Sequence, residues 1–274
     1  MSEIAQPFAP RVSASLVRVA NTPAARRIAA VLVLILAWEL AAILQNNPIM
    51  LPRFSATVLA AIDAIRSDNI VGAVWVSLSV LLKGYAIALA VTLALVAAAA
   101  VNGFARDMLQ MLTAMLNPLP AIALLPLALL WFGLGETSII FVLCHAVVWP
   151  LSLAALTGFD TVPPTQRLVG RNYGLSGPKF LALILIPAAL PSLLSGLKIG
   201  WAFAWRTLIA AELVFGVTSG SGGLGWFIFR NRNDLLTDKV FAGLATVIAI
   251  GLLVEILVFR TIEQRTVRRW GMAR

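Results

Sequence analysis

Long apolar runs separated by short polar breaks are the main feature of this chain. Six runs come close to, or exceed, the roughly 20 residues that a helix needs to cross the hydrocarbon core of a bilayer. They cover approximately residues 28–44, 75–101, 108–132, 138–159, 190–215 and 240–259. The third run contains Pro118, Pro120 and Pro126, which predict a kinked helix. The pattern therefore predicts an all-α polytopic membrane protein with six transmembrane helices.

A shorter segment, residues 54–66, lies between the first two runs and has a different pattern. Phe54, Val58 and Ile62 recur at helical spacing, whereas Asp63 falls outside this apolar stripe. Such a segment is typical of an amphipathic helix that lies in the membrane interface.

The composition supports a membrane protein and excludes other classes. Hydrophobic residues make up 60% of the 274 residues and charged residues only 12%, whereas soluble domains carry about 25% charged residues. The net charge of +9 does not indicate nucleic-acid binding, because the basic residues flank apolar runs and form no basic face or known motif.

The positive charges predict the orientation in the membrane, because arginine and lysine are enriched in cytoplasmic loops. With the N-terminus inside, the cytoplasmic pieces hold Arg11, Arg18, Arg26, Arg27, Arg106, Arg167, Arg171, Lys179, Arg260, Arg265, Arg268, Arg269 and Arg274, and the outer loops hold only Arg53, Arg66, Arg230, Arg232 and Lys239. We therefore expect the protein to span the inner membrane of a bacterium, with both termini in the cytoplasm. The expected parts are a cytoplasmic N-terminal segment (1–27), a transmembrane domain (28–262) and a basic cytoplasmic tail (263–274).

The largest predicted cytoplasmic loop covers approximately residues 160–189. Two short helices that are interrupted near Gly174 fit this segment, because glycine allows a backbone conformation in which two helices meet at an angle. Pro187 and Pro191 are expected to end the second short helix and to begin the next span. A rigid elbow of this kind can transmit a push from a soluble partner to a membrane helix; an ordinary connecting loop is the alternative.

This loop resembles the coupling loop of binding-protein-dependent ABC importer permeases. The signature of that family is Glu-Ala-Ala, three residues, Gly, nine residues and Ile-x-Leu-Pro, and here Gly174 is followed after nine residues by Ile184-Leu185-Ile186-Pro187. Further segments are similar to the nitrate, sulfonate and taurine branch of the family, namely Leu51-Pro52, Leu130–Glu136, Pro187–Pro191, Gly196–Ile199, Ala210–Glu212 and Gly223–Gly225. The resemblance covers approximately residues 51–263.

One position departs from the family signature. The Glu-Ala-Ala triplet falls on Leu168-Val169-Gly170, so its acidic residue is missing, and Arg167 and Arg171 could supply alternative polar contacts. The residues that the resemblance assigns to the coupling loop are Arg167, Arg171, Gly174, Gly177, Ile184 and Pro187.

The resemblance implies the type I ABC importer fold and a transport function. It implies a homodimer that docks two ATPase subunits and receives its solute from a periplasmic or lipid-anchored binding protein. The implied solute is a small anion such as a sulfonate, taurine or nitrate, moved by alternating access. No Gly-x-x-x-x-Gly-Lys-Ser/Thr sequence occurs in the chain, so ATP would be bound and hydrolysed by the partner. An ATP-independent secondary transporter or channel is the alternative.

Charges inside membrane spans are functional candidates, because they are costly to place in lipid. Arg206 and Glu212 lie within the fifth span, six residues apart, so a direct pair between them on one helix is not expected. Glu39 and Lys83 are candidate ionic partners, as is a second protomer. Arg206 is either part of a structural ion pair or a pathway residue that attracts an anion.

Two further candidates on the fifth span are aromatic. Trp201 and Trp205 are four residues apart and therefore share a helix face with Arg206 close by. They can line a translocation pathway or pack against a neighbouring helix. Together with Arg206 and Glu212 they form the set of candidate pathway residues.

Enzymatic chemistry and cofactor binding are not expected. The single cysteine, Cys144, and the single histidine, His145, are neighbours in sequence and project differently from a helix, so we expect both to serve helix packing. Residues 220–225 fit a Gly-x-Gly-x-x-Gly pattern, but they follow a membrane helix rather than a strand and are interpreted as an outer turn. We predict no metal and no cofactor.

Overall fold

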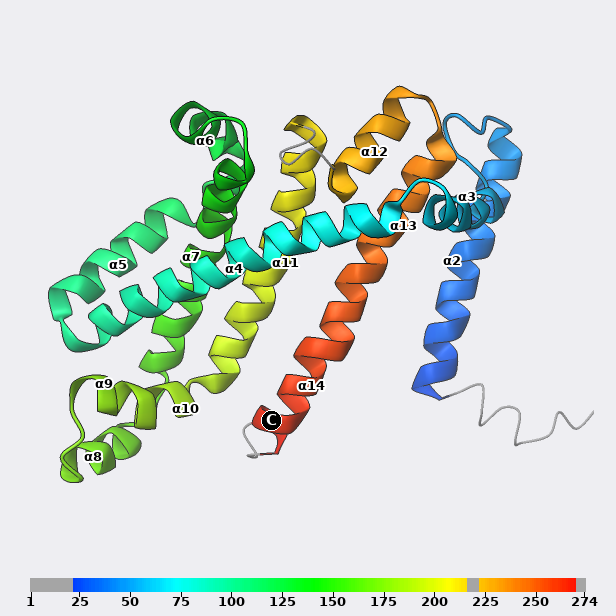
Figure 1. The fold of residues 1–274 in the computed structure, drawn as a ribbon. Coiled ribbons are helices and arrows are strands. Elements are labelled where there is room, and N and C mark those ends of the chain that lie inside the picture. The colour runs from blue at the N-terminus through cyan, green and yellow to red at the C-terminus, as the bar shows by residue number, and fades with distance from the viewer. Residues whose placement is uncertain (1–21, 216–221, 270–274) are drawn as a thin grey trace, which may run out of the picture.

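The computed structural model describes residues 22–215 and 222–269, and these residues form helices joined by short turns (Figure 1). In chain order the elements are α2 (Pro23–Gln45), α3 (Phe54–Arg66), α4 (Ile70–Val101), α5 (Gly103–Leu116), η1 (Ala121–Leu124), α6 (Leu125–Phe132), α7 (Glu136–Asp160), α8 (Pro164–Asn172), α9 (Gly177–Phe180), η2 (Leu181–Leu185), α10 (Ile186–Ala188), α11 (Leu190–Phe215), α12 (Leu224–Asn233), α13 (Thr237–Val254), η3 (Glu255–Phe259), α14 (Arg260–Glu263) and η4 (Gln264–Arg268). The elements η2, η3 and η4 are single π-helical segments, and η1 is a 3₁₀ turn.

The prediction of six spans is confirmed, with two of the spans broken. Four unbroken helices are long and apolar enough to cross a membrane: Ala25–Gln45, Ile70–Val101, Glu136–Asp160 and Thr237–Val267. Two bent pairs complete the set: Gly103–Leu116 with Ala121–Phe132, and Gly177–Ala188 with Leu190–Val214. The predicted amphipathic helix over residues 54–66 is α3.

The third span is not the kinked helix that we predicted, because its two halves meet at 91°. Pro118 and Pro120 explain the right angle. Neither residue has a backbone N–H to donate, and each disfavours helical backbone in the residue before it. Two prolines within three residues therefore end α5 and leave only turn-type hydrogen bonds, such as Ala123 N–H to Pro120 O at 2.9 Å. Pro126 causes no break, since it lies in the first turn of α6.

The core is built around α7, which packs against α4 on one side and α11 on the other. Leu81 of α4, Leu143 of α7 and Leu208 of α11 are fully buried at this contact. Small residues let the helices approach closely: a Cβ on Gly84 would lie 2.8 Å from Leu143 Cδ1, and one on Gly196 would lie 2.5 Å from Ala154 Cβ. Close approach at small residues is a common way for membrane helices to associate.

The periphery is apolar and open. α2 packs mainly on α3 and is exposed along most of its length, with Trp38 contacting the rings of Phe54 and Phe241 at 5.4 and 5.6 Å. Large apolar side chains such as Leu34 and Leu252 are exposed on the outer helices. In a protein of this hydropathy such surfaces are suited to lipid.

The elements gather at two ends of the molecule. α8, α9 and α10 lie together at one end, which we call the α8 side, and α6 and α12 lie at the opposite end, the α12 side (Figure 1). The start of α2 and the end of η4 both face the α8 side (Figure 1). Most of the predicted N-terminal segment 1–27 and the end of the predicted tail 263–274 lie outside the described residues.

Candidate functional site

The loop between α7 and α11 forms the predicted pair of short helices with Gly174 between them. α8 ends in a Schellman motif: the N–H of Leu175 donates to Gly170 O at 3.0 Å, and the N–H of Gly174 donates to Arg171 O at 2.9 Å. Gly174 adopts a φ of 73° and Gly177 a φ of 53°, in the left-handed region that favours glycine. The sequence prediction of a glycine-dependent break in this loop is therefore confirmed.

α8 packs on the second half of the loop through a glycine. A Cβ on Gly170 would lie 2.8 Å from Ile184 Cγ1 and 2.9 Å from Phe180 Cε2, so only glycine allows the two short helices to cross this closely. Ile184, the first residue of the Ile-x-Leu-Pro-like motif, thus packs against the position that ends the altered Glu-Ala-Ala triplet.

Two apolar side chains of α8 and the residue at its C-terminal cap are exposed. Leu168 is 57% exposed and Tyr173 is 81% exposed, and Val169 lies exposed between them.

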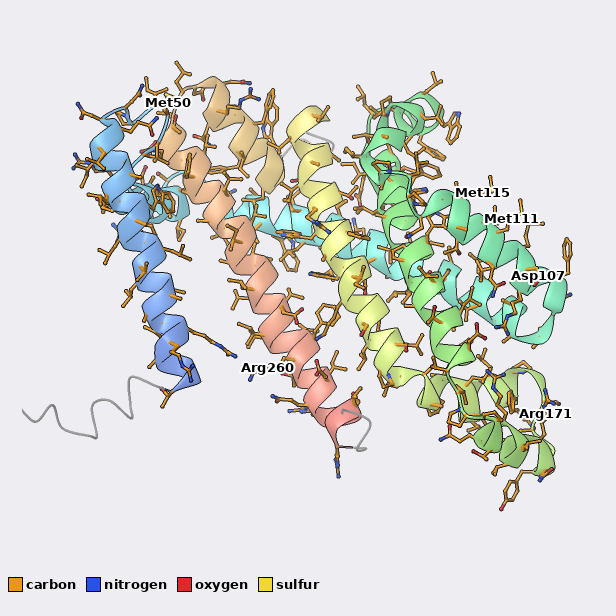
Figure 2. All side chains as sticks on the ribbon, turned by 180° about the vertical axis from the view of Figure 1, so that it is seen from behind. Met50, Asp107, Met111, Met115, Arg171 and Arg260 are labelled. Atoms are coloured by element: carbon orange, nitrogen blue, oxygen red, sulfur yellow. The ribbon has the colours of Figure 1, made fainter. Side chains whose placement is uncertain are left out.

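The two arginines of α8 have different surroundings. Arg167 is half-buried and donates to the carbonyl oxygens of Phe159 and Val162, which fixes α8 to the end of α7. Arg171 is exposed at the outer edge of α8 (Figure 2) and has no hydrogen bond or ion pair with any described residue. Both arginines, with Arg106, line a cavity of about 490 Å³ beneath the loop. Arg106 forms an ion pair with Asp160.

The loop continues into α11 through a bend of 80° at Ala189. Pro187 lies in the last turn before the bend and Pro191 in the first turn after it, as the sequence predicted. Near this bend, Lys198 of α11 pairs with Glu263 at 2.9 Å and with Glu255 at 3.3 Å. The start of α11 is therefore tied to the last span.

Glu212, near the far end of α11, is almost completely buried at 3% exposure. The hydroxyl of Ser77 on α4 donates to its carboxylate at 2.8 Å, and the N–H of Gly225 donates to Oε2 at 2.8 Å. The N–H of Leu224 donates in turn to Ser77 Oγ at 2.8 Å. We call Ser77, Glu212, Leu224 and Gly225 the Glu212 anchor, since they join α4, α11 and the start of α12.

The expected ionic partners of Glu212 and Arg206 bind elsewhere. Lys83 pairs with Glu136 at 2.8 Å, and Glu39 accepts from the backbone and side chain of Ser55. No described cation lies within ion-pair distance of Glu212. Its negative charge instead faces the N-terminus of α12, where backbone N–H groups favour an anion.

Trp201 and Trp205 both pack within the helix bundle. Trp205 is 6% exposed, and its indole N–H donates to Val247 O of α13 at 3.3 Å. Trp201 contacts the rings of Tyr85 at 5.5 Å and Phe259 at 6.4 Å. These contacts correspond to the packing alternative for both residues.

Arg206 is exposed on α11 and lines a cavity. Its Nε donates to Ala202 O one turn earlier at 3.1 Å, and its guanidinium lies 5.0 Å from the ring centre of Phe203.

Cys144 and His145 form no joint site in the described part of the chain. Cys144 donates to Gly84 O at 3.6 Å, while His145 contacts the ring of Trp149, so the two residues do not act together. Residues 22–215 and 222–269 hold no cluster of three or more metal-ligating side chains.

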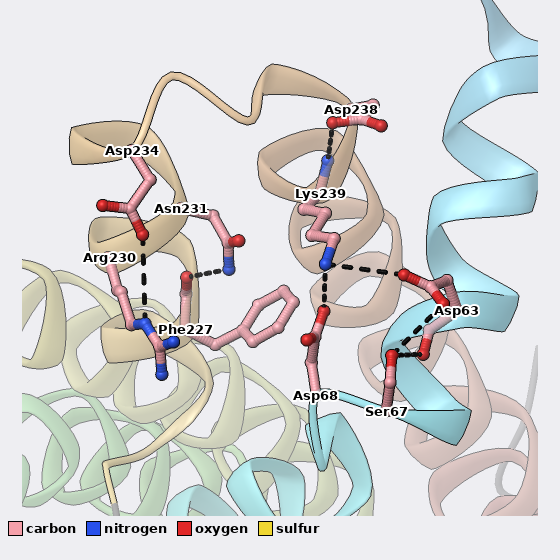
Figure 3. Close-up of polar contacts among 9 residues, drawn as sticks. All are labelled: Asp63, Ser67, Asp68, Phe227, Arg230, Asn231, Asp234, Asp238 and Lys239. Atoms are coloured by element: carbon pink, nitrogen blue, oxygen red, sulfur yellow. Dashed lines mark hydrogen bonds and ion pairs between the residues drawn. The ribbon is translucent and has the colours of Figure 1, made fainter.

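A polar network holds the α12 side together. Lys239 of α13 pairs with Asp68 at 2.5 Å and with Asp63 of α3 at 3.5 Å (Figure 3). Nearby, the side chain of Asn231 donates to Phe227 O, one turn earlier in α12 (Figure 3). The network fixes the amphipathic helix to the last span.

These features define a polytopic membrane protein with six spans, two of them broken, and a glycine-hinged helical loop on one side. Residues 90–268 match the family described as the inner membrane component of binding-protein-dependent transport systems. The chain belongs to this family, which covers more than half of its length.

Similar proteins include permeases from several organisms. An ABC transporter permease protein of Methanocaldococcus jannaschii is 31% identical over 222 residues, which are 80% of this chain and 82% of that protein. The taurine transport system permease of Escherichia coli K12 is 36% identical over 58% of this chain and 56% of its own length. The nitrate import permease of Synechocystis is 32% identical over 66% and 65%. The match therefore spans less than two thirds of the last two proteins.

Proposed function

We propose that this chain is the permease subunit of an ABC importer that carries a small anion across the inner membrane. Two copies form the transport unit, two ATPase subunits bind ATP and dock on the α8 side, and a periplasmic or lipid-anchored binding protein delivers the solute. Both termini are cytoplasmic in this arrangement. The protein itself forms and breaks no covalent bond.

The observation that carries the proposal is the exposed surface of α8. Leu168, Val169 and Tyr173 offer apolar contact, and Arg171 beside them offers an unpaired positive charge. Because position 168 is leucine and not glutamate, this surface suits a partner groove that is apolar with an acidic rim. Arg167 supports the surface from beneath through its bonds to the end of α7.

The fold links this surface to the membrane helices. α8 packs on η2, and η2 leads through α10 and the 80° bend into α11. When the ATPase pair closes on ATP, the docked α8 moves with it and α11 follows. That movement opens the transport path to the outside, and hydrolysis resets it, which is alternating access.

Two further observations support an anion and a dimer. Relatives are named as permeases for taurine, nitrate, sulfonates and bicarbonate, all of them small anions or zwitterions with an anionic group. α5 carries an exposed apolar face that includes Met111 and Met115, which point away from the bundle (Figure 2). This face offers a surface to the second copy.

The test is recovery of partners from the native membrane. The tagged chain is extracted in mild detergent and its partners are identified and quantified by mass spectrometry. We expect a stoichiometric ATPase with the wild-type chain and its loss in Arg171→Glu and Leu168→Asp. Gly174→Pro is expected to abolish docking too, because proline cannot adopt a positive φ.

The matched control is Arg66→Glu, which reverses an exposed arginine at the end of α3, away from α8. It should retain the ATPase. Recovery of the wild-type chain without an ATPase, folded and monodisperse, would contradict the proposal and favour an ATP-independent transporter or channel.

A further inference from the structure

A cavity of about 390 Å³ lies where the broken third span meets α7 and α11. The turn between α5 and η1, which includes Asn117, forms one wall. His145 and Trp149 of α7 form a second wall, and Arg206 and Thr207 of α11 form a third. The space is many times the ~30 Å³ that one water occupies in the liquid, so it can hold a small solute together with water.

The α7 wall carries polar atoms without partners. Both ring nitrogens of His145 and the indole Nε1 of Trp149 are buried and make no hydrogen bond with any described residue. Leaving such groups unpaired is costly. The indole N–H can only donate, and a neutral imidazole donates from one nitrogen, so each of these groups would be stabilised by an acceptor that reached it.

The charge in the cavity is positive and uncompensated. Lys83, Lys198 and Lys239 each pair with a carboxylate, whereas Arg206 has no carboxylate within ion-pair distance among the described residues. Among the residues that the structure describes, no aspartate or glutamate lines the cavity. The guanidinium bonds only to a carbonyl of its own helix and keeps most of its five N–H donors available.

A second cavity lies next to the first, toward the α8 side. It has a volume of about 310 Å³ and shares Asn117 and Pro118 with the first. Thr113 and Asp160 line this second cavity. The two cavities are therefore neighbours along α5 and α7.

We propose that the cavity between α5, α7 and α11 binds a small oxyanion or sulfonate. Arg206 supplies the charge and planar donors that match such oxygens, and Asn117 and Thr207 are polar residues that line the same cavity. The site lies within one chain. It deepens the proposed function, on which it rests, by locating where the anion stops inside the membrane.

The test measures binding to the full-length chain reconstituted alone in lipid nanodiscs, with no ATPase and no binding protein. Saturation-transfer NMR follows the methyl signal of methanesulfonate during a titration in gluconate buffer, with nitrate as competitor and choline as a cationic probe. We expect saturable methanesulfonate binding that nitrate displaces, and no saturable choline binding.

The variants locate the site. Arg206→Gln should weaken methanesulfonate binding about ten- to a hundredfold, as expected for the loss of hydrogen bonds to a charged group. Arg206→Lys should lose less than Arg206→Gln, because it keeps the charge and removes the planar donors. Arg66→Gln is the matched control, since that arginine is exposed at the end of α3 outside this cavity, and should bind as the wild type does.

The proposal is overturned if the wild-type chain shows no displaceable methanesulfonate signal, or if Arg206→Gln binds as tightly as Arg66→Gln. If Arg206→Gln elutes as an aggregate, Arg206→Lys takes its place. This variant retains the charge and must then bind methanesulfonate more weakly than the wild type does. The partner test is independent of this one. Failure of anion binding with a co-purified ATPase removes the site and leaves the importer, whereas anion binding without an ATPase removes the importer and leaves the site.

Discussion

Glu212 and Arg206 are two charges on one membrane helix, about 9 Å apart along its axis, and their surroundings are opposite. Glu212 is buried and receives hydrogen bonds from Ser77 and from the backbone of Gly225. Arg206 is exposed at a cavity and bonds only to Ala202 O on its own helix. Glu212 is therefore bonded to other parts of the fold, whereas most of the donors of Arg206 remain available to a ligand.

A charged residue within a span therefore does not by itself indicate a transport role, as Glu212 shows. A buried carboxylate can be satisfied by hydroxyl and backbone N–H groups, with no cation near it. The Glu212 anchor joins three helices in this way, so its loss should act on stability. Arg206 makes few contacts, so its loss should act on transport. Four substitutions test this contrast.

Glu212→Ala should have the largest effect on stability. It leaves the N–H of Gly225 and the Ser77 hydroxyl without their acceptor and opens a cavity, which together cost more than about 3 kcal/mol. We expect poor recovery of folded protein and a clear drop in the midpoint of thermal unfolding, followed by fluorescence in detergent. A Glu212→Ala protein as stable as the wild type would show that the anchor is dispensable.

Gly225→Ala should come next. Its Cβ would lie 2.6 Å from Glu212 Cβ and 2.7 Å from Ile209 O, and the backbone oxygen cannot move aside cheaply. We expect a loss of about 1–3 kcal/mol in unfolding free energy, as for other overpacked sites. Gly103→Ala serves as the control in the same unfolding assay, because no atom lies within 4 Å of the added methyl.

Ser77→Ala should be milder, at about 1–2 kcal/mol, because it removes one donor to Glu212 and leaves the N–H of Leu224 unpaired. The double variant Ser77→Ala with Glu212→Gln tests whether the two side chains interact. Residues in one hydrogen-bonded network are not additive, so the double variant should lose less than the sum of the two single losses. Strict additivity would mean that the two side chains do not interact.

Arg206→Gln should have the smallest effect on stability, within about 0.5 kcal/mol, as is usual for an exposed side chain with few contacts. Uptake of the solute in whole cells should nevertheless be lost. A stability loss as large as that of Ser77→Ala would break the contrast, because Arg206 would then be a structural residue as well.

Much of the fold could be predicted from the sequence, because it depends on local patterns. The apolar stripe that begins at Phe54 predicted α3, and Gly174 predicted the break between two short helices in the loop over residues 160–189. The right-angle break at Pro118 and Pro120 was predicted only as a kink. A bend angle depends on what the two halves pack against, and the sequence of one segment does not contain that information.

The surroundings of the charges could not be predicted. The search for partners of Glu212 considered charged side chains such as Lys83, but Ser77 lies 135 positions away and the other donor is a backbone N–H. Neither carries a charge that a sequence pattern would reveal. One signal was present, since Gly223 and Gly225 lie where a Cβ would approach Glu212. We interpreted that glycine cluster as an outer turn; its first two residues lie outside the described part of the chain.

The 80° bend at Ala189 gives α11 the geometry of a lever. The helix has 26 residues and is therefore about 39 Å long. If it turned by about 10° around the bend, Arg206 would move sideways by about 4 Å and the far end by about 7 Å, from the rise per residue of a straight helix. A small rotation of the loop between α7 and α11 would thus become a displacement of several ångströms at the far end of α11.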